Sequence, residues 1–217
     1  MPRRHQLLPR LVAGAALLLG ACARDRIHVV RVSVADQRMA VYRKDVEIAR
    51  FPVSTSKFGV GDIPGSNRTP LGKLEVARKI GASAPQGMKF KNRVPTGEIV
   101  PVNAPGRDPI VTRILWLRGL ERENVNAFQR MIYIHGTPEE SRLGSPASYG
   151  CVRMASSDIV RLFNTVGEGA RVFISTEPLP TPPAPSAVAP PLTQNPHRPS
   201  LPPLSPSPTS SLTTDQP

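Results

Sequence analysis

The chain has 217 residues and carries 28 Lys and Arg against 16 Asp and Glu, a formal charge of +12. Its two cysteines and four histidines form no cluster, which leaves out a disulfide scaffold and a zinc site built from these ligands. An excess of basic residues of this size first suggests nucleic acid as a partner. The first residues of the chain argue against such a partner, because they resemble an export signal.

Residues 1–21 have the layout of a secretory signal: three arginines without an acid, the apolar run LVAGAALLLGA, and small residues at its end. The run is too short to span a bilayer, which takes about 20 residues. Removing this segment lowers the formal charge from +12 to +9, because it holds three arginines and no acid. We therefore expect no nucleic acid. The charges predict an anionic envelope polymer or lipid headgroup as partner or, since they are scattered, only a well-solvated surface.

The signal ends in a motif for lipid attachment. The sequence LGAC, which ends at Cys22, resembles the bacterial lipobox, whose cysteine becomes the lipid-modified first residue of the mature chain. We expect a lipid anchor at Cys22 and a linker over residues 22–26 that hold the protein to a membrane without spanning it. Ala23 resembles the sorting pattern for the outer membrane of a two-membrane bacterium, which predicts a periplasmic location. The alternative is ordinary cleavage that leaves Cys22 passive.

Residues 27–176 form one predicted domain of 150 residues, a size that buries a substantial core. Its apolar residues mostly alternate with polar ones, the period of half-buried strands. About six short strands without interleaved helices predict a β-sandwich or barrel rather than a parallel α/β sheet. The segments with this pattern are 29–34, 38–43, 46–53, 72–80, 110–117, 131–136 and 170–175.

A single helix is predicted after Cys151. Ser156 or Ser157 is expected to cap it, and Gly167 to end it. The apolar residues at helical spacing are Ile159, Leu162, Phe163 and Val166.

The last segment, 177–217, changes character: its final 40 residues hold 14 of the 26 prolines. Such a composition buries too little apolar area to offset the entropy of ordering. We predict a disordered tail, partly polyproline II, that serves as a spacer or as a docking strip.

Cys151 and His135 are the strongest candidates for chemistry. With Cys22 lipidated, Cys151 is a lone thiol, which is a hazard in an oxidising compartment unless it is buried or used. His135 ends an apolar strand 16 positions earlier, and the loop between them can bring the two together. A nearby imidazole or helix N-terminus would lower the thiol pKa from about 8.5 to about 3.5–7.5. The alternative is a buried, unreactive cysteine near a hydrogen-bonded histidine.

The stretches HGT (135–137) and SPASYGCVRM (145–154) resemble the signature of the L,D-transpeptidase catalytic domain family. In that signature a His-Gly pair precedes a Ser/Thr-His-Gly-Cys element, and Arg or Asn follows two places after the cysteine. Residues 32–56 resemble the family's opening hairpin and third strand, and residues 67–76 its Thr-Pro-x-Gly turn. The resemblance thus covers nearly all of 27–176. It implies a mainly β, sandwich- or barrel-like fold with a short helix after the nucleophile, a periplasmic location, and peptidoglycan stem peptides as substrate. We expect no cofactor and no metal.

By this resemblance Cys151 would attack the carbonyl at the L-centre of a diamino acid in a tetrapeptide stem, release D-alanine and remain as a thioester. His135 would pair with the thiolate and transfer protons, and the carbonyl of Gly136 would orient its ring. Backbone N–H groups around Gly150 and Cys151 would receive the oxyanion.

Residues on either side of the cysteine would bind the substrate. Arg153 would hold a carboxylate of the donor peptide; the alternative is a salt bridge with Asp158 or a loop acid. Ser148, Tyr149 and Gly150 would complete the binding surface.

Tyr149 departs from the family pattern, which has histidine at this place. If that histidine shapes the pocket, the tyrosine hydroxyl can replace it; if it is needed for catalysis, the domain is slow or inert. Three hypotheses follow: a transpeptidase that joins stems to each other or to an envelope protein, a hydrolytic carboxypeptidase or link-cutting peptidase, and a non-catalytic tether between membrane and peptidoglycan.

Overall fold

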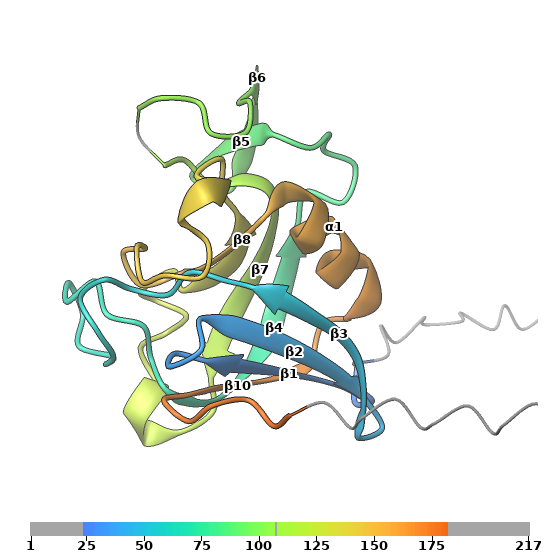
Figure 1. The fold of residues 1–217 in the computed structure, drawn as a ribbon, viewed down its shortest axis with the longest axis vertical. Coiled ribbons are helices and arrows are strands. Elements are labelled where there is room, and N and C mark those ends of the chain that lie inside the picture. The colour runs from blue at the N-terminus through green and yellow to red at the C-terminus, as the bar shows by residue number, and fades with distance from the viewer. Residues whose placement is uncertain (1–23, 107, 182–217) are drawn as a thin grey trace, which may run out of the picture. The chain divides into compact units, whose positions relative to one another are not determined.

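The computed structural model describes residues 24–106 and 108–181. The predicted signal, the lipidation site Cys22 and the tail from residue 182 onward lie outside the described residues. The described part contains ten strands, one α-helix and two short 3₁₀ helices (Figure 1). Their bounds are β1 His28–Ser33, β2 Arg38–Arg43, β3 Val46–Pro52, β4 Gly72–Ile80, β5 Met88–Lys91, β6 Val94–Ile99, β7 Val111–Gly119, η1 Arg122–Asn124, β8 Tyr133–Gly136, η2 Glu140–Arg142, β9 Val152–Met154, α1 Ser156–Thr165 and β10 Arg171–Ser175.

All ten strands belong to one mixed sheet. The main path runs β3-β2-β1-β10-β4-β7-β5-β6, and β8 branches from β7 to carry β9. The pairs β1–β10 and β8–β9 are parallel and the other pairs are antiparallel. The predicted mainly β fold with a short helix after Cys151 is confirmed. The sequence did not predict β5, β6 or β9, because β9 has three residues and every residue of β6 is exposed.

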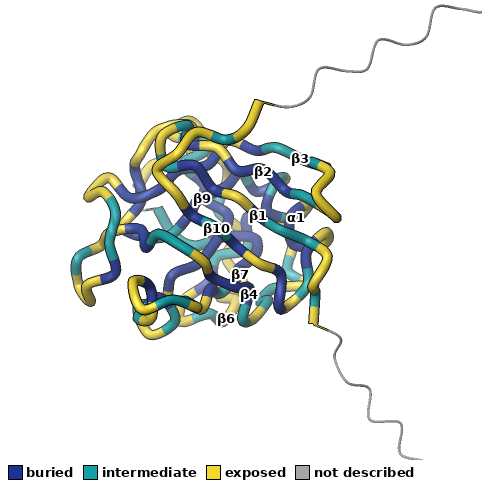
Figure 2. The backbone as a smooth tube through the Cα atoms, turned by 90° about the horizontal axis from the view of Figure 1, so that it is seen from below, coloured by how far each residue is buried: buried dark blue, intermediate teal, exposed yellow. Residues whose placement is uncertain are grey.

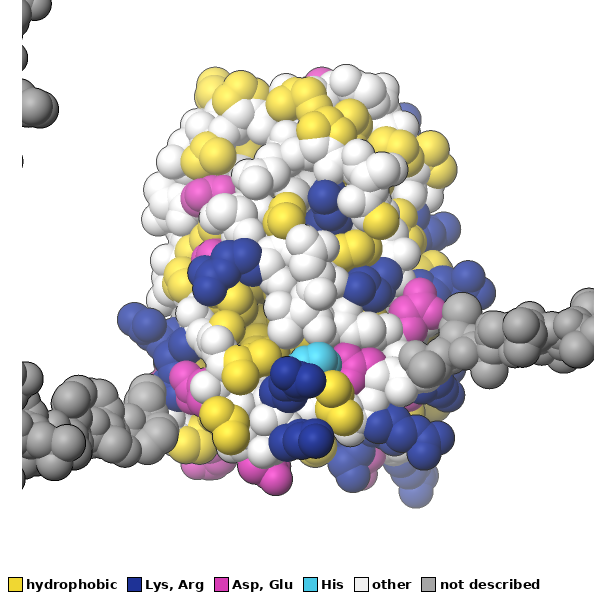
Figure 3. Space-filling model, turned by 90° about the vertical axis from the view of Figure 1, so that its right-hand side faces the viewer, with side chains coloured by type: hydrophobic (Ala, Val, Ile, Leu, Met, Phe, Trp, Pro, Cys, Tyr) yellow, Lys and Arg dark blue, Asp and Glu magenta, His cyan; other side chains and the backbone are white. Residues whose placement is uncertain are grey.

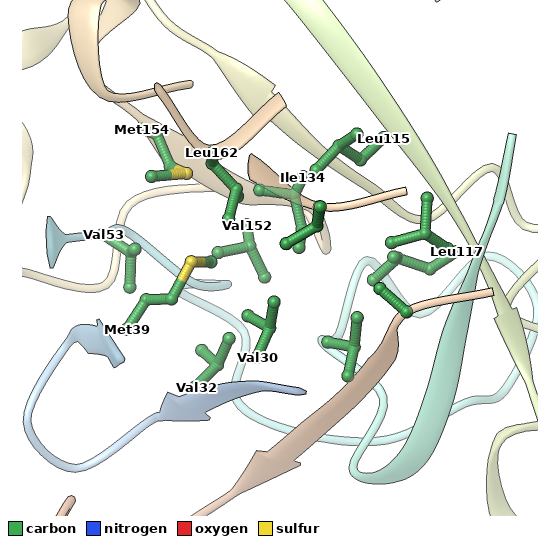
Figure 4. Packing of buried hydrophobic residues seen from close by; sticks show 14 of the residues in the cluster. Val30, Val32, Met39, Val53, Leu115, Leu117, Ile134, Val152, Met154 and Leu162 are labelled. Atoms are coloured by element: carbon green, nitrogen blue, oxygen red, sulfur yellow. The ribbon is translucent and has the colours of Figure 1, made fainter. Parts of the chain in front are cut away.

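The sheet closes over one large core, and a smaller apolar cluster of Phe90, Ile114 and Tyr133 is separate from it. Figure 4 shows side chains of β1 and β2, among them Val30 and Met39, facing Val152 of β9, Ile134 of β8 and Leu162 of α1. These side chains are at most 1 % exposed, and each contributes about 1.5–3 kcal/mol to folding when fully buried. In Figure 2 the buried segments, drawn in dark blue, lie mostly inside the domain, and the exposed segments, drawn in yellow, lie mostly around its edge. The core therefore fixes the inner faces of β8 and β9, and with them the side chains on the opposite faces.

Helix α1 packs against β7 and β8 through Ile159, Leu162 and Phe163. The predicted serine cap is wrong: the N-cap is Ala155, and no side chain caps the helix from that position. The N–H of Ser156 donates instead to a carboxylate oxygen of Glu140 at 2.8 Å. A carboxylate at the positive end of a helix makes a charge-assisted hydrogen bond, which is stronger than a hydroxyl cap.

The first residues of the proline-rich segment lie against the sheet. The N–H of Leu179 donates to Asp36 at 2.7 Å, and the carbonyl of Pro180 accepts from Arg50 at 2.6 Å. Figure 3 shows Lys and Arg side chains spread over the face it displays, interrupted by Asp, Glu and uncharged side chains. Within residues 24–106 and 108–181, no helix has the length and apolar character that crossing a membrane requires.

Candidate active site

The parallel pair β8–β9 carries the candidate residues on one face. His135 lies opposite Arg153, and Ile134 lies opposite Val152. Because side chains alternate along a strand, Tyr133 and His135 share one face of β8. Cys151 lies directly before β9, and its Sγ is 3.4 Å from the backbone nitrogen of Tyr133. Ile134 and Val152 point the other way, into the core. The structure thus places the predicted histidine on β8 and the predicted cysteine directly before β9, the strand that pairs with β8.

The turn that carries Cys151 is held by a buried serine and threonine. The hydroxyl of Ser148 donates to the carbonyl of Cys151 at 2.6 Å and accepts from the N–H of Gly150 at 3.2 Å. The hydroxyl of Thr69 donates to the carbonyl of Gly150 at 3.0 Å. Gly150 has φ +116°, a conformation that favours glycine. Ser148 is only 2 % exposed, and its hydroxyl is occupied by these two hydrogen bonds within the turn.

The Cys151 thiol is half-buried and lies among apolar side chains, including Tyr133. Its Sγ accepts from the N–H of Tyr133 at 3.4 Å and donates to the carbonyl of Met131 at 3.5 Å. Burial raises the pKa of this thiol to about 11. The expectation of a lowered pKa is therefore wrong for this conformation, because desolvation outweighs the nearby cations Arg130 and Arg153.

His135 is 4 % exposed, and its Nδ1 lies 2.8 Å from the carbonyl oxygen of Gly136. This carbonyl accepts a proton only from Nδ1–H, so the lone pair of the neutral ring is on Nε2. Burial lowers the pKa of His135 below its usual value. Among the described residues, no hydrogen bond joins His135 to Cys151. Both groups are consequently neutral near pH 7, a thiol beside an imidazole rather than an ion pair.

Arg153 is 2 % exposed and bound to two acids from loops. Its Nη1 donates to Asp108 and, at 3.0 Å, to Glu139. Asp108 also accepts from the hydroxyl of Thr137. Asp158, the other partner considered for Arg153, contacts Arg161 instead at 3.8 Å. Arg153 thus forms the salt bridge with loop acids that was the alternative to substrate binding. Its Nε and Nη2 are buried and have no hydrogen-bond partner among the described residues.

Cys151 lines a hollow of about 590 Å³. One wall comes from the 58–71 loop and the segment around Arg130, and the opposite wall from the β5–β6 hairpin and Ile110. Arg130 is paired with Asp62 at 2.7 Å, an ion pair that fastens the loop to this segment. The hollow has Cys151, the only free thiol among the described residues, in its wall.

Tyr149 stands at the mouth of this hollow and is 64 % exposed. Lys57 donates to its hydroxyl at 2.9 Å and lies 4.3 Å from the centre of its ring, which lowers the tyrosine pKa. Phe58 packs beside it with ring centres 5.4 Å apart. Tyr149 is therefore held in place by Lys57 and Phe58, and it presents a hydroxyl at the position where the L,D-transpeptidase signature has histidine.

Sequence reasoning did not single out Thr69, Asp108, Glu139, Lys57 or Arg130. Each reaches the site from a loop distant in sequence, so no local spacing relates it to Cys151. The Thr-Pro-x-Gly turn beginning at Thr69 was the one available signal. Among the described residues, no group of three or more His, Cys, Asp or Glu side chains is arranged to hold a metal ion.

Gly136 supports the site by its lack of a side chain. A Cβ atom there would lie 2.6 Å from the carbonyl oxygen of Val111 and 3.1 Å from Ile159. We expect Gly136→Ala to lower the free energy of unfolding by about 3 kcal/mol, because β8 would be forced away from β7 and α1. Gly97→Ala, whose Cβ meets nothing within 4 Å but whose φ is +85°, should cost only about 1 kcal/mol. Denaturant unfolding measures both, and equal losses would contradict the crowding at Gly136.

Comparison with known proteins gives a family match over residues 27–174, to the model described as "YkuD: L,D-transpeptidase catalytic domain". The "Putative L,D-transpeptidase YqjB" of Bacillus subtilis is 42 % identical over 48 residues, 22 % of this chain and 27 % of that protein. L,D-transpeptidase 3 of Mycobacterium tuberculosis is 16 % identical, with TM-score 0.46 and coverage of 69 % of this chain and 61 % of that one. An L,D-transpeptidase of Mycobacterium smegmatis is 14 % identical, with TM-score 0.44 and coverage of 69 % of this chain and 58 % of that one. The chain thus spans about a quarter of the curated relative and about three fifths of these solved chains.

Proposed function

The chain belongs to the YkuD family of L,D-transpeptidase catalytic domains, and from this membership we propose that it joins peptidoglycan stem peptides through a thioester on Cys151. The observation that carries the proposal is the pairing of β8 with β9. β8 carries His135, and Cys151 directly precedes β9, with the thiol in the wall of a hollow of about 590 Å³. A nucleophile, a base and an adjoining space for a peptide are the parts that acyl transfer requires.

The reaction starts from the neutral pair. Rotation about the Cα–Cβ bond of Cys151 turns Sγ from the Met131 carbonyl toward His135, whose Nε2 takes the thiol proton as sulfur attacks. The carbonyl of Gly136 holds the ring throughout, because it binds Nδ1–H at 2.8 Å. The new S–C bond replaces the C–N bond to D-alanine, and the imidazolium returns its proton to the leaving amine. An acceptor amine then attacks the thioester, His135 takes its proton, and the released thiolate recovers it.

Of the two groups expected at the oxyanion, the N–H of Gly150 already donates to Ser148 at 3.2 Å. We therefore propose that the N–H of Cys151 binds the oxyanion. The N–H of Gly150 becomes a second donor once the Ser148 hydroxyl moves away from it. Ser148 also binds the carbonyl of Cys151. The same serine consequently fixes both ends of the turn that presents the nucleophile.

The test is mass spectrometry of the purified protein after incubation with a disaccharide-tetrapeptide, with and without an acceptor stem. We expect loss of D-alanine and an adduct on Cys151, with cross-linked dimer when acceptor is present. Tripeptide product alone would indicate the hydrolytic enzyme. Unchanged substrate with retained binding to sacculi would indicate the non-catalytic tether, which Tyr149 and the missing hydrogen bond between Cys151 and His135 favour.

The hydroxyl of Tyr149 is expected to substitute for the family histidine. Tyr149→Phe removes the 2.9 Å contact with Lys57, and we expect kcat/KM for D-alanine release to fall about 10-fold, the value of one hydrogen bond to a charged group. Tyr42→Phe is the matched control, because Tyr42 lies on β2 and its hydroxyl donates to Glu47 of β3 at 3.2 Å, outside the hollow. Steady-state kinetics measure kcat/KM for both variants. An equal loss of kcat/KM in Tyr149→Phe and Tyr42→Phe would show that the Tyr149 hydroxyl has no specific role at the site.

We further propose that the protein is exported, lipid-anchored at Cys22 and faces the periplasm, with the basic surface toward the cell wall. The support is the LGAC motif at the end of the apolar run 11–21. The intact mass of membrane-extracted protein tests this, since a mature chain beginning at any residue other than Cys22 excludes the anchor.

A further inference from the structure

One stretch of β7 departs from the alternation of a half-buried strand. All residues of 111–115 are buried, whereas a strand with one face on the core buries every second residue. The pairing with β8 explains this. Thr112 and Arg113 have no partners on β8, because the residues on either side of them pair with the consecutive residues Gly136 and His135. These two residues of β7 therefore form a bulge beside the peptide that joins His135 to Gly136.

The backbone of this bulge is strained. Thr112 has φ +71° and is fully buried. Among the described residues it is the only β-branched one at positive φ, a conformation in which its side chain crowds the backbone. A residue in such a conformation persists only where its surroundings hold it, and residues of this kind gather at functional sites. The conformation of Thr112 thus requires a support and indicates a use.

The hydroxyl of Thr112 ties the bulge to two other elements. It accepts from the N–H of Gly87 at 2.9 Å and shares a hydrogen bond of 2.8 Å with the hydroxyl of Ser156. Gly87 directly precedes β5, which belongs to the hairpin that walls the Cys151 hollow, and Ser156 begins α1. Both hydrogen bonds are buried, so loss of the hydroxyl would leave the N–H of Gly87 without its acceptor.

Arg113 adds a second set of contacts to the bulge. Its Nη1 donates to the carbonyl of Thr112 at 2.6 Å and to the carbonyl of Ala84. Its guanidinium carbon lies 5.5 Å from the ring centre of Phe163 on α1. Burial lowers the pKa of this guanidinium, and no acid among the described residues offsets the effect. Arg113 thus uses its buried hydrogen bonds on the backbone of the bulge and of the loop before β5.

The bulge lies against the residue that orients the His135 ring. A Cβ atom on Gly136 would be 3.1 Å from Cβ of Thr112 and 2.6 Å from the carbonyl oxygen of Val111. The carbonyl of Gly136 in turn lies 2.8 Å from Nδ1 of His135. Because interiors packed this closely transmit displacements, a shift of the bulge also shifts the carbonyl that accepts Nδ1–H.

We propose that the bulge formed by Thr112 and Arg113 positions His135, and that the Thr112 hydroxyl is the group that holds this bulge in place. Thr112 is a positioning residue, since it does not line the hollow that contains Cys151 and acts through Gly136. The inference rests on the proposed function, in which Nε2 of His135 takes the thiol proton. With the bulge in place, the ring keeps Nδ1–H on the carbonyl and Nε2 free. Without it, the ring exchanges between its two tautomers.

Three substitutions of Thr112 test this. Thr112→Val keeps the shape of the side chain and loses the hydroxyl, Thr112→Ser keeps the hydroxyl, and Thr112→Gly loses it but adopts φ +71° without strain. We expect kcat for D-alanine release to fall about 10- to 100-fold in the Val and Gly variants, the effect of a displaced catalytic group, with KM within about 2-fold. Thr112→Ser should retain kcat within about 3-fold. Thr112→Gly should unfold at no lower denaturant concentration than Thr112→Val.

Nitrogen NMR of the full chain with labelled histidines measures the tautomer and the pKa of His135 without turnover, and the signals missing from His135→Gln assign the ring. In the unsubstituted protein and in Thr112→Ser we expect one tautomer, with the proton on Nδ1. In Thr112→Val and Thr112→Gly we expect both tautomers. The pKa of His135 should also rise toward its usual value in these two variants, because a looser ring is less desolvated.

Thr165→Val is the control, because it removes an exposed hydroxyl that donates to Arg161 at 2.8 Å at the end of α1. It should change neither kcat nor His135. An unchanged tautomer and pKa of His135 in both Thr112→Val and Thr112→Gly would overturn the inference, and so would a Thr112→Gly chain that does not fold. Altered His135 signals in these variants, without D-alanine release by the unsubstituted protein, would retain the positioning role and refute the transpeptidase.

Discussion

Cys151→Ala and Cys151→Ser are expected to reduce D-alanine release at least about 10³-fold, because no other group can form the acyl intermediate. The free energy of unfolding should change by no more than about 1 kcal/mol, since the thiol is only half-buried and its hydrogen bonds to Tyr133 and Met131 are long, at 3.4 and 3.5 Å. Loss of turnover with unchanged unfolding would therefore report chemistry rather than folding. Stopped assays of free D-alanine measure the first quantity and denaturant titration the second.

The control is Cys22→Ala, which leaves Cys151 as the sole thiol of the chain. This variant should retain turnover in detergent solution. D-Alanine release by Cys151→Ala at more than about a tenth of the original rate would rule out covalent catalysis at this residue.

His135→Gln should have the second-largest effect, a fall in kcat of about 10²–10⁴-fold, because the thiol with a pKa of about 11 needs a base to ionise during attack. Glutamine keeps a donor for the carbonyl of Gly136 but has no basic nitrogen. His28→Gln is the control. His28 begins β1, its Nδ1 lies 2.8 Å from a carboxylate oxygen of Asp25, and it does not line the hollow that contains Cys151. Equal turnover in both variants would show that His135 is only structural.

The pH profile gives an independent check. The pKa of His135 is lowered, so the ring is protonated, and useless as a base, only below about pH 6.5. Activity should fall on the acid side of that value and persist above pH 7. The unfolded state binds the proton more readily than the folded one, so stability should also decrease as pH falls through the same range. A profile that already declines above pH 8 would point to an ion pair instead of the neutral pair.

Alkylation of Cys151 by iodoacetamide reports the same distinction without substrate. Burial raises the pKa of the thiol to about 11, so the second-order rate at pH 7 should lie well below that of a free thiol and increase up to pH 9. A thiolate held by His135 would react rapidly and independently of pH in this range.

Several features of the fold were predictable because they depend on local pattern. Alternation in segments such as 38–43 and 72–80 predicted strands that the structure contains. The apolar spacing of Ile159, Leu162 and Phe163 likewise predicted α1. The cap of this helix was not predictable, because its first N–H binds Glu140, a residue of η2 that lies 16 positions earlier. Exposed β6 and the three-residue β9 also lack a pattern strong enough to identify them.

The sequence by itself determined the family resemblance and the mainly β character, since both are expressed in residue types at short spacing. It also predicted Cys151 and His135 as the candidates for catalysis. Tertiary structure decided the protonation of that pair, because burial and desolvation depend on everything packed around it. It also decided the surroundings of Arg153, whose partners Asp108 and Glu139 come from separate loops. Strand pairing sets which side chains share a face, and only the closed sheet brings those distant charges together.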